Sequence, residues 1–321
     1  MRTDTGDAGI PGQHTYHLDD SQPHSFWDKS LPARVSIESG DSVVFETLEG
    51  TGQVTPATLS ETLGELDPSL IHALTGPVYV NGALPGDTLE IEVLSLEHDG
   101  WGWNGVIPGF GLLGWEFETP YIHHYAIVDG VCVFRDDIHI PYEPFCGVMG
   151  VAPAEPSRLD TTPPRQNGGN VDIRHLTPGA RVFLPVLVEG GLFSCGDCHA
   201  AQGDGEVCGT GIETPMTVTL RFQLHKNRST PELQFLTAPG ETLTRADQAG
   251  YFVTTAHGAD LFTNAQTAVR YMLDHLVAEH ALTREQAYCL CGAAVDLRIS
   301  EIVDEPNWIV SAYLPLSVFK Q

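Results

Sequence analysis

The stretch from 190 to 212, GGLFSCGDCHAAQGDGEVCGTGI, concentrates the residues that could carry out chemistry. Asp197, His199, Asp204 and Glu206 lie within ten residues, and seven glycines surround them across the stretch. Holding carboxylates and an imidazole together is costly unless a cation or a substrate accepts them. Glycine allows the backbone to take positive φ and to approach a ligand closely. The stretch therefore predicts an active site.

Spacing within this stretch predicts two pairs of side chains. Asp197 and His199 are two residues apart, and so are Asp204 and Glu206. Residues i and i+2 of an extended segment point to the same side. A carboxylate with an imidazole is typical of a hydrolytic zinc site or a related divalent site. Glu206, if it is not a ligand, could be the general base. The alternative is a polar loop whose carboxylates accept hydrogen bonds from backbone amides.

The cysteines of the stretch allow other interpretations. Cys195 and Cys198 form a C-x-x-C motif, which occurs in zinc knuckles and redox pairs. No second C-x-x-C stands at knuckle spacing, because Cys289 and Cys291 form only a C-x-C within a helical pattern. We therefore favour buried thiols that pack as small apolar side chains. A nucleophilic cysteine at 195 or 198 stays open as an alternative.

The surrounding chain must position these residues, and its patterns indicate antiparallel β-structure. Alternating apolar runs follow turn signals at 39–41, 85–87 and 178–179. The glycine-rich and aromatic segment 100–114 is expected to be irregular, either a wall or lid over a pocket or a packed loop. Further loops are expected at 50–70, with a short helical piece, at 141–156 and at 163–172.

The last third of the chain has a different pattern. An apolar stripe at i, i+3, i+4 spacing predicts a helix that begins at Asn264. Thr283 and Gln286 form a capping-box pair for a second helix. Strand patterns return at 296–303 and 309–319. We expect an α+β C-terminal part attached to a mainly β body, with residues 1–12 as a frayed arm.

Composition limits the partners and the compartment. The 321 residues include 42 acidic and 16 basic side chains, a formal charge of −26, which argues against nucleic acid and membrane surfaces as partners. Such an acidic, lysine-poor surface suits a salt-rich environment, where screening relieves self-repulsion. The seven cysteines follow no apolar signal segment, and no apolar run approaches about 18 residues. We expect a cytoplasmic protein with reduced thiols.

At this point the residues support a resemblance. The run from 190 to 213 resembles the signature of the acetamidase/formamidase family, in which a GDxHAAQGDGE core recurs. Other blocks of the family resemble this chain in the same order, from about His24 to Phe319. They are HSFWDKSLPARVSIESGDSVVFET, HALTGPVYVNGALPGDTLEIEVL, IPYEPFCGVMGVAP, NGGNVDIRHLTPGARVFLPV and AYCLCGAAVDLRISEIVD.

The resemblance implies hydrolysis of small linear amides, such as formamide and acetamide, to ammonia and a short carboxylate. It also implies a divalent metal, expected to be zinc, and a homo-oligomer, either a dimer or a tetramer. The implied fold is mainly β, with a jelly-roll-like sandwich, a smaller β-barrel-like part and an α+β C-terminal part. We expect three closely packed regions at 1–160, 161–235 and 236–321.

By position, the polar residues of the family's motif match Asn170, Asp172, Asp197, His199, Asp204 and Glu206. Our hypothesis for the mechanism gives these residues roles, in which Asp172, Asp197 and His199 are expected to hold the metal. Glu206 is expected to shuttle the proton, with Asp204 and His199 also in catalytic roles. The expected substrate pocket is lined by Asn170, Trp101, Trp103 and Phe110, and a small pocket would favour formamide or acetamide. The alternatives are an amidase with a cysteine nucleophile and a non-enzymatic jelly-roll protein that binds a cation or a small solute.

Overall fold

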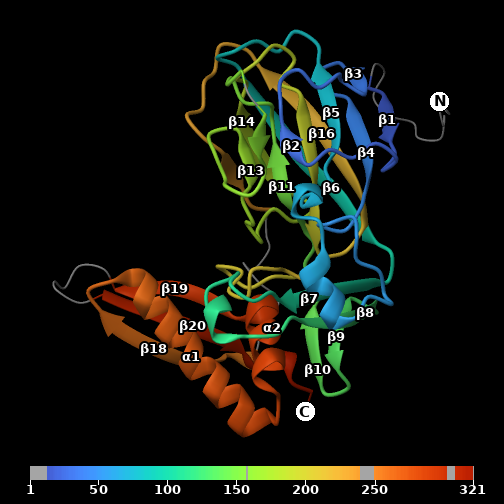
Figure 1. Ribbon diagram of the computed structural model, residues 1–321. Helices are drawn as coiled ribbons and strands as arrows, with labels where there is room; N and C mark the ends of the chain where they lie inside the picture. The colour runs from blue at the N-terminus through green and yellow to red at the C-terminus, as the bar shows by residue number, and fades with distance from the viewer. Residues whose placement is uncertain (1–12, 157, 239–248, 302–307, 321) are drawn as a thin grey trace.

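The upper half of the molecule is a sandwich of two β-sheets (Figure 1). The computed structural model describes residues 13–156, 158–238, 249–301 and 308–320. The first sheet has six strands, in the order β1 (Thr15–Leu18), β4 (Ser42–Thr47), β16 (Met216–His225), β6 (Thr88–His98), β14 (Arg181–Pro185) and β17 (Gln234–Leu236). The second has five, in the order β13 (Gly168–Asn170), β11 (Phe145–Gly150), β15 (Phe193–His199), β5 (Thr75–Val80) and β3 (Val35–Ile37).

Side-chain alternation explains the packing of these sheets. In β16 the apolar side chains at every second position from Met216 to Phe222 are buried, and the intervening residues are partly exposed. Phe45 and Phe222 of the six-stranded sheet meet Phe193 of the other sheet edge to face, with ring centroids 6.1 and 5.2 Å from Phe193. The hydrophobic core therefore lies between the sheets, where burial of apolar surface stabilises the fold.

Strand β15 lies in the middle of the five-stranded sheet. It pairs antiparallel with β11 on one side and with β5 on the other, and all seven of its residues are buried. A short two-stranded sheet of β2 (Phe26–Trp27) and β12 (Leu159–Asp160) lies nearby, and Trp27 packs with Leu74, just before β5, and with Val148 of β11. The end of β15 is thus fixed from several sides.

The lower half begins with a four-stranded antiparallel sheet. Its strands run in the order β10 (Ile138–Pro141), β9 (Val131–Arg135), β8 (Tyr121–Val128) and β7 (Trp101–Val106). Over the described residues this sheet is open, so the smaller β-barrel-like part is not a closed barrel. The short 3-10 helix η1 (Ser60–Glu65) contacts β8 of this sheet. Two further short 3-10 helices are η2 (Pro68–Leu70) and η3 (Gly114–Glu116).

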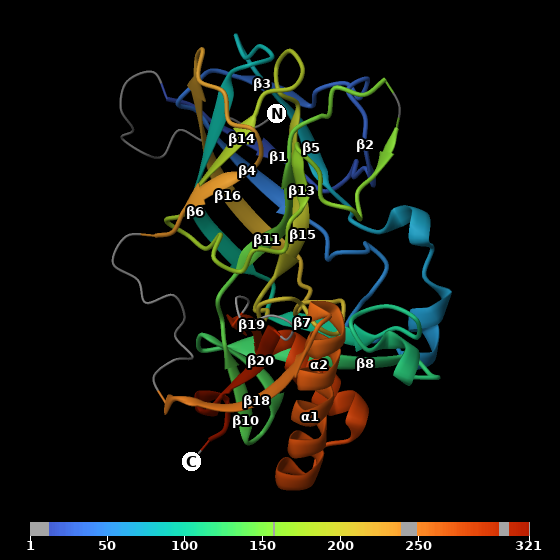
Figure 2. The same ribbon diagram turned by 90° about the vertical axis from the view of Figure 1, so that its left-hand side faces the viewer.

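The C-terminal part is α+β, as the sequence predicts. Helix α1 (Leu261–His280) packs on a sheet of β18 (Tyr251–Gly258), β20 (Trp308–Pro315) and β19 (Asp296–Glu301), and α2 (Arg284–Ala294) lies between α1 and β7 (Figure 2). The short helix η5 (Leu316–Val318) follows β20. None of the helices described is long and apolar enough to cross a membrane.

Two helix starts were predicted, with different outcomes. The capping box of Thr283 and Gln286 is present at the start of α2. Helix α1 begins earlier than Asn264, because the Asp260 side chain accepts a hydrogen bond from the Thr263 amide and caps it there. Asn264 instead donates to the Gly258 carbonyl from inside the first turn.

Three segments that were predicted as loops contain strands. Segment 100–114 contains β7, segment 141–156 contains β11, and segment 163–172 contains the short β13. The glycines of these segments suggested irregular structure. In the fold, the glycines instead lie where another chain segment comes close. A Cβ at Gly102 would lie 3.0 Å from the Glu213 carbonyl oxygen, and a Cβ at Gly150 would lie 2.8 Å from the Trp27 ring. The predicted arm at residues 1–12 lies outside the described residues.

The predicted regions correspond only partly to the sheets. Strands from both 1–160 and 161–235 pair in the six-stranded sheet, whereas β18, β19, β20 and both α-helices belong to 236–321. The division into three regions therefore stays a prediction.

Candidate active site

His199 lies at the end of β15 with its side chain fully buried. Its Nδ1 is 2.8 Å from Oε1 of Gln202, and Nε2 of Gln202 donates to the Asp172 carbonyl at 2.9 Å. Because Nε2 of Gln202 donates to the Asp172 carbonyl, Oε1 of Gln202 faces the His199 ring and accepts the Nδ1 proton. In the neutral ring this hydrogen bond leaves the lone pair on Nε2.

Carboxylates surround that nitrogen. His199 Nε2 lies 3.1 Å from Glu213 Oε1, 3.7 Å from Asp197 Oδ2 and 3.9 Å from Glu206 Oε1. The Glu213 contact does not have hydrogen-bond geometry, and Nε2 has no hydrogen-bond partner among the described residues. Asp172 Oδ1 and Glu213 Oε2 are also buried without a partner there. Buried polar atoms of this kind call for a bound species that is not part of the chain.

A hairpin brings Glu213 opposite His199. The Ala200 amide donates to the Ile212 carbonyl at 2.7 Å, and the Thr214 amide donates to the Cys198 carbonyl at 2.9 Å. An isolated bridge pairs Glu213 with His199 in the same register. Glu206 is at the middle of this hairpin, equally far in sequence from 199 and 213. The glycine-rich stretch therefore folds back on the end of β15 and contributes two carboxylates.

Three glycines allow the close approach of these groups. A Cβ at Gly50 would lie 2.2 Å from Asp197 Oδ1, one at Gly147 2.6 Å from Asp172 Oδ1, and one at Gly211 2.4 Å from His199 Nδ1. No side chain fits at such distances. The Gly147 carbonyl also accepts the Asp172 amide at 3.2 Å, which holds Asp172 beside β15.

The backbone at the site is in an unusual conformation. Asp172, Asp197 and Glu206 have φ values of 46°, 53° and 43°, and His72 has a φ of 58°. These are four of the eight non-glycine residues with positive φ in the described part of the chain. Left-handed backbone at such residues costs free energy and persists where the surrounding structure enforces it. The fold therefore stores strain where the carboxylates converge.

Glu49 builds the loop that places Gly50. Its buried carboxylate accepts hydrogen bonds from the Thr51 amide and hydroxyl, the Gln53 amide and the Val54 amide, at 2.7 to 3.1 Å. It also accepts Nε1 of Trp103 at 3.0 Å. Five donors on one carboxylate define a rigid loop.

Burial controls the protonation of the cluster. Loss of water raises the pKa of Asp172 to about 7 and the pKa of Glu213 to about 8, although His199 opposes both shifts. Burial also raises the pKa of Glu206 well above its usual value. Burial disfavours the His199 imidazolium, but attraction to Glu213, Asp197 and Glu206 outweighs it and raises that pKa well above its ordinary value. The cluster thus requires positive charge at its centre.

A divalent cation fits this donor set. Ligand atoms of Asp172, Asp197 and His199 lie within 4.8 Å of one another, and so do those of His199, Glu206 and Glu213. Both groups contain His199, whose Nε2 has the one ring lone pair that is not engaged with Gln202 and can bind one ion. The arrangement therefore suits one cation, with the remaining carboxylates near it.

Two other predicted site residues, Asp204 and Asn170, are outside both groups of candidate ligands. The Asp204 amide donates to Asp296 Oδ1 at 3.0 Å, and the Asp204 carboxyl has its pKa raised by burial and by Asp296. Asp204 is not in either cation-binding group, and its catalytic role stays a prediction. Asn170 lies two residues before Asp172 in β13, with Nδ2 donating to the Thr162 carbonyl at 3.2 Å.

The aromatic residues predicted to line the pocket do not form one wall. Trp103 is buried and bonded to Glu49, and its backbone pairs with Glu213. Trp101 packs beside it in a small hydrophobic cluster. Phe110 is 47% exposed and contacts Gly209. Their role in binding substrate stays a prediction.

The cysteines of the stretch favour the packing interpretation. Cys195 and Cys198 are fully buried free cysteines. The Cys198 thiol donates a hydrogen bond to the Cys146 sulfur at 3.6 Å. Burial raises the pKa of Cys195, and the bond to Cys146 together with burial raises that of Cys198 well above its usual value. A reactive cysteine needs an accessible thiolate, which both shifts oppose.

Sequence reasoning missed four residues of the site. Glu213, Glu49, Gln202 and His72 were not assigned roles in the site. His72 Nε2 lies 3.8 Å from Asp197 Oδ2, and its Nδ1 lies 3.0 Å from the Thr161 hydroxyl. A hairpin centred on Glu206 would have predicted that 213 faces 199. Gln202 lies in the signature three residues after His199, which was the available signal for it. No local pattern indicated Glu49 or His72.

Comparison with known proteins gives consistent results. The model of the Acetamidase/Formamidase family matches residues 12–158 and 154–321. A formamidase from Methylophilus methylotrophus is 28% identical, over 94% of this chain and 90% of that protein. An acetamidase from Mycolicibacterium smegmatis is 28% identical over 58% of this chain and 62% of its own length.

Solved structures share the fold. A gamma lactamase from Delftia acidovorans superposes with a TM-score of 0.87 at 25% identity, covering 95% of this chain and 94% of that one. An acetamidase from Bacillus halodurans superposes with a TM-score of 0.67 at 33% identity, covering 94% of this chain and 97% of that one.

Proposed function

The chain belongs to the Acetamidase/Formamidase family and is an amidohydrolase of small linear amides, and we propose that it works through a single divalent cation. The products are ammonia and a short carboxylate. We assign Asp172, Asp197 and His199 as the residues that hold the cation. Glu213 lies close enough to complete the set.

One observation carries the proposal. Nε2 of His199 is buried, has no hydrogen-bond partner among the described residues and faces three carboxylates. Its tautomer is fixed by Gln202, as is usual for histidines that bind metals. When bound, the cation would polarise the amide carbonyl and lower the pKa of a water molecule.

Glu206 is proposed as the proton carrier. Its side chain is 20% exposed, whereas that of Asp197 is 8% exposed, so it can reach a substrate that enters from solvent. Burial holds its pKa well above the usual value, which favours a carboxylate that takes a proton and gives it up again. Glu206 accepts a proton from the attacking water and delivers it to the leaving nitrogen.

An ammonia-release assay tests the function. Purified protein is incubated with formamide, acetamide and propionamide, and bound metals are quantified in the same sample. We expect ammonia release, about one equivalent of metal per chain, and loss of activity after chelation that returns on adding the metal. Full activity in a chelated, metal-free sample would refute the role of the cation.

The same assay separates the alternatives. Loss of activity on thiol alkylation, in protein without metal, would support a cysteine nucleophile. Metal binding without ammonia release from any amide would support a solute-binding or cation-binding protein.

A cyclic amide is a second candidate substrate, favoured by the TM-score of 0.87 with a gamma lactamase. Water would add across the ring C–N bond and give an amino acid, so no ammonia would be released. The assay therefore includes a γ-lactam with detection of a new primary amine. A lack of new amine at enzyme levels that hydrolyse acetamide would exclude this substrate.

Three further properties are proposed. Zinc is the expected metal, since mixed carboxylate and imidazole ligands are typical of hydrolytic zinc sites. We also propose a homo-oligomer, a dimer or tetramer, and a cytoplasmic location. Metal analysis, light scattering and cell fractionation test these in turn.

A further inference from the structure

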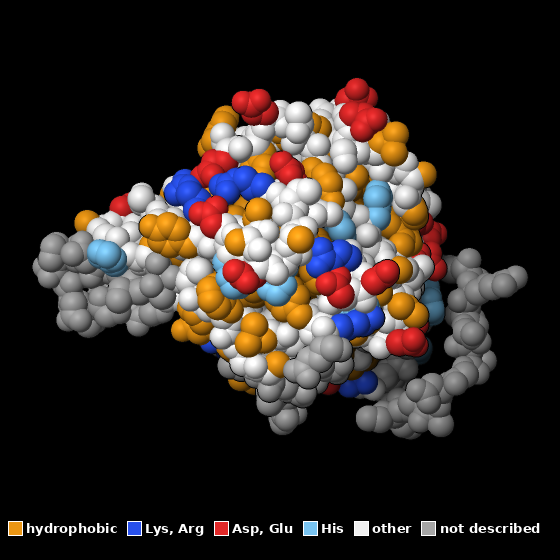
Figure 3. Space-filling model, turned by 90° about the horizontal axis from the view of Figure 1, so that it is seen from below, with side chains coloured by type: hydrophobic (Ala, Val, Ile, Leu, Met, Phe, Trp, Pro, Cys, Tyr) orange, Lys and Arg blue, Asp and Glu red, His pale blue; other side chains and the backbone are white. Residues whose placement is uncertain are grey.

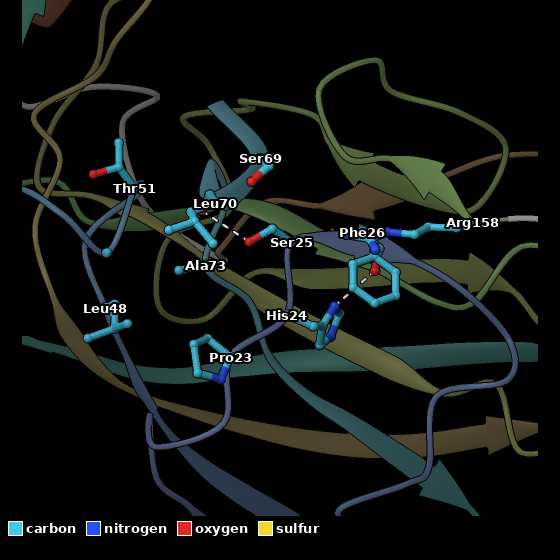
Figure 4. A pocket seen from close by; sticks show the side chains of 11 residues that line it. Pro23, His24, Ser25, Phe26, Leu48, Thr51, Ser69, Leu70, Ala73 and Arg158 are labelled. Carbon is cyan, nitrogen blue, oxygen red and sulfur yellow. Dashed lines mark hydrogen bonds between the residues drawn. The ribbon is translucent and has the colours of Figure 1, made fainter. Parts of the chain in front are cut away.

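A cavity of about 210 Å³ lies outside the candidate active site. Its lining comes from three segments, 23–26, 48–52 and 69–73, and from Arg158. Figure 4 shows these side chains, with Phe26 between His24 and Arg158. None of the described residues that line the cavity belongs to the carboxylate cluster. The cavity is therefore a separate place on the molecule, with a surface chemistry of its own.

Most of the cavity wall is apolar. Side chains of Pro23, Phe26, Leu48, Leu70 and Ala73 contribute to it. Ligand pockets in proteins typically combine such walls with a small number of polar groups that fix the orientation of the ligand. An apolar cavity of about 150 Å³ can bind benzene, so this larger cavity has room for a ring-sized apolar group.

Four polar side chains of the lining already have partners within the chain. The hydroxyls of Ser25, Thr51 and Ser69 donate to a backbone carbonyl or to a carboxylate, at 3.0, 2.8 and 2.7 Å. His24 Nδ1 lies 2.9 Å from the Phe26 carbonyl, and its Nε2 lies 2.8 Å from a serine hydroxyl. Burial lowers the pKa of His24 to about 4, so its ring is neutral. These side chains offer a ligand neither charge nor a free ring nitrogen.

Arg158 differs from these four. Its guanidinium lies over the Phe26 ring, 3.5 Å from the ring centre, and Figure 4 shows it pointing toward that ring. Among the described residues the guanidinium has neither a hydrogen bond nor an ion pair. Asp28 is near enough for the charge of Arg158 to add to the lowering of its pKa, which hydrogen bonds with Ser30 dominate, but it forms no ion pair with Arg158.

The contact with Phe26 fixes the kind of group that Arg158 can bind. A guanidinium has five N–H donors in its plane, so contact with a ring through its face leaves the donors at the edge available. Two of them match the two oxygens of a carboxylate, and such charge-assisted pairs are stronger than neutral hydrogen bonds. The lining thus combines an apolar wall with one available fork for an anion.

We propose that this cavity binds an organic monocarboxylate with a ring-sized apolar body, a class that benzoate represents. The apolar body lies among segments 23–26, 48–52 and 69–73, and the carboxylate accepts two hydrogen bonds from Arg158. The ligand does not contact the carboxylate cluster. Its binding is therefore independent of amide hydrolysis and of the cation proposed for it.

Isothermal titration calorimetry on the purified protein tests both halves of the ligand. Benzoate carries a ring and a charge, benzyl alcohol carries the ring alone, and acetate carries the charge alone. We expect saturable binding of about one benzoate per chain, with affinities for the other two about tenfold weaker or less. Added NaCl should weaken the binding of benzoate, because Arg158 is exposed and salt screens its charge.

Arg158→Met tests the contact with the anion. It should lower the affinity for benzoate by about tenfold, toward that for benzyl alcohol. Because Arg158 is exposed, the substitution leaves the core intact. Arg228→Met is the matched control, since Arg228 is also exposed and near a phenylalanine ring but lies outside the cavity lining. It should keep the wild-type affinity.

Leu70→Trp tests the apolar wall. Leu70 is 47% exposed and lines the cavity, so an indole there takes up space that the ring of benzoate needs. The affinity for benzoate should fall by about tenfold, as for other misfits in apolar pockets. Leu84→Trp, at a 49% exposed position outside the lining, should leave it unchanged.

Titration after chelation separates this cavity from the active site. Benzoate that binds a cation at the carboxylate cluster would be lost on chelation and retained in Arg158→Met, and that pattern would overturn the proposal. Equal affinity in the wild type and Arg158→Met, unchanged affinity in Leu70→Trp, or no saturable binding would also overturn it. Binding that survives chelation and falls in both variants supports the site, whether or not the protein hydrolyses amides.

Discussion

At the scale of single residues, Glu206 combines left-handed backbone with a partly exposed carboxylate 3.9 Å from His199. We expect Glu206→Gln to lower kcat by about 10²- to 10⁴-fold, because the amide cannot take up a proton. Metal content should stay near the wild-type value, since other carboxylates hold the cation. Steady-state kinetics and metal analysis check both expectations. Exposed Glu65→Gln is the control, and an unchanged kcat in Glu206→Gln would remove the proton role.

Glu213 should make the metal-free protein sensitive to pH. Its folded-state pKa of about 8 is above the unfolded value of about 4.3, so the folded state binds the proton more tightly. The resulting stability is complete below about pH 4.3 and is lost as the pH rises through 8. Glu213→Gln removes this loss. Relative to the wild type, its free energy of unfolding should rise by up to about 3 kcal/mol between pH 5.5 and 8.

Urea unfolding of chelated protein at several pH values measures this difference. Glu65→Gln again serves as control, since its carboxylate is exposed. Parallel pH profiles for the wild type and Glu213→Gln would contradict the expectation.

The sequence predicted part of the site for a clear physical reason. Asp197, His199 and Glu206 are close in the chain, so spacing alone brought them together. Predicting that Glu213 belongs to the site would have required the register of the hairpin that pairs it with His199. His72 and Glu49 are far from the stretch 190–212 in sequence and lie beside it only in the folded chain. No local sequence pattern therefore predicts that they belong to the site.

At the scale of elements, the buried Arg174 joins the C-terminal sheet to the site. Its guanidinium pairs with Asp296 of β19 and with Glu143 at 3.0 Å. Asp296 also accepts the Asp204 amide, in the hairpin that carries Glu206. Arg174 itself follows Asp172 by two residues. The C-terminal sheet thus supports two of the segments that form the site.

Arg174→Met should therefore cost about 3–5 kcal/mol of stability, because it leaves the buried Asp296 with only the partly exposed Arg298 and takes the arginine away from Glu143. It should also weaken metal binding. Thermal unfolding and metal titration measure these effects. Arg181→Met is the matched control, because the Arg181 side chain is 47% exposed where it pairs with Glu90, and should cost less than about 1 kcal/mol. Equal losses in the two variants would contradict a special role for Arg174.

Helices and strands were predicted correctly where a short stretch of sequence had a clear apolar pattern or a capping motif. Strands were missed where glycines are needed for close packing against another segment. The alternation at 88–98 gave β6, and the capping box gave the start of α2. Strands β7 and β11 were missed because Gly102, Gly105, Gly147 and Gly150 read as loop residues. At these four positions a side chain would collide with a neighbouring chain segment, and only the folded structure shows which segments come close.

At the scale of the whole molecule, charge is the dominant surface property. The formal charge is −26, although some acidic side chains lie beside basic ones on the face seen in Figure 3. Arg270 and Arg284 both pair with Glu116, for example. Sixteen basic side chains cannot neutralise 42 acidic ones, so net repulsion opposes the compact state.

Stability should therefore increase with salt. The Debye length falls from about 10 Å at 0.1 M to about 3 Å at 1 M, which screens the repulsion. We expect the melting temperature to rise by roughly 2–3 °C between 0.05 and 1 M NaCl, equivalent to a gain of about 1–2 kcal/mol for a chain of 321 residues. Scanning calorimetry measures the rise, and sucrose at matched osmolality controls for general solute effects. A melting temperature independent of NaCl would contradict this expectation.

The order of the strands also affects how a newly made chain acquires its metal. Gly50 and His72 are synthesised early, whereas Glu213 and the supporting Asp296 come late. At about 5–20 residues per second, roughly 8–30 s pass between Gly50 and Glu213. Until then β4 and β6 lack β16, the strand that joins them. During translation the chain has exposed apolar strands and an incomplete ligand set, so metal loading should follow release from the ribosome.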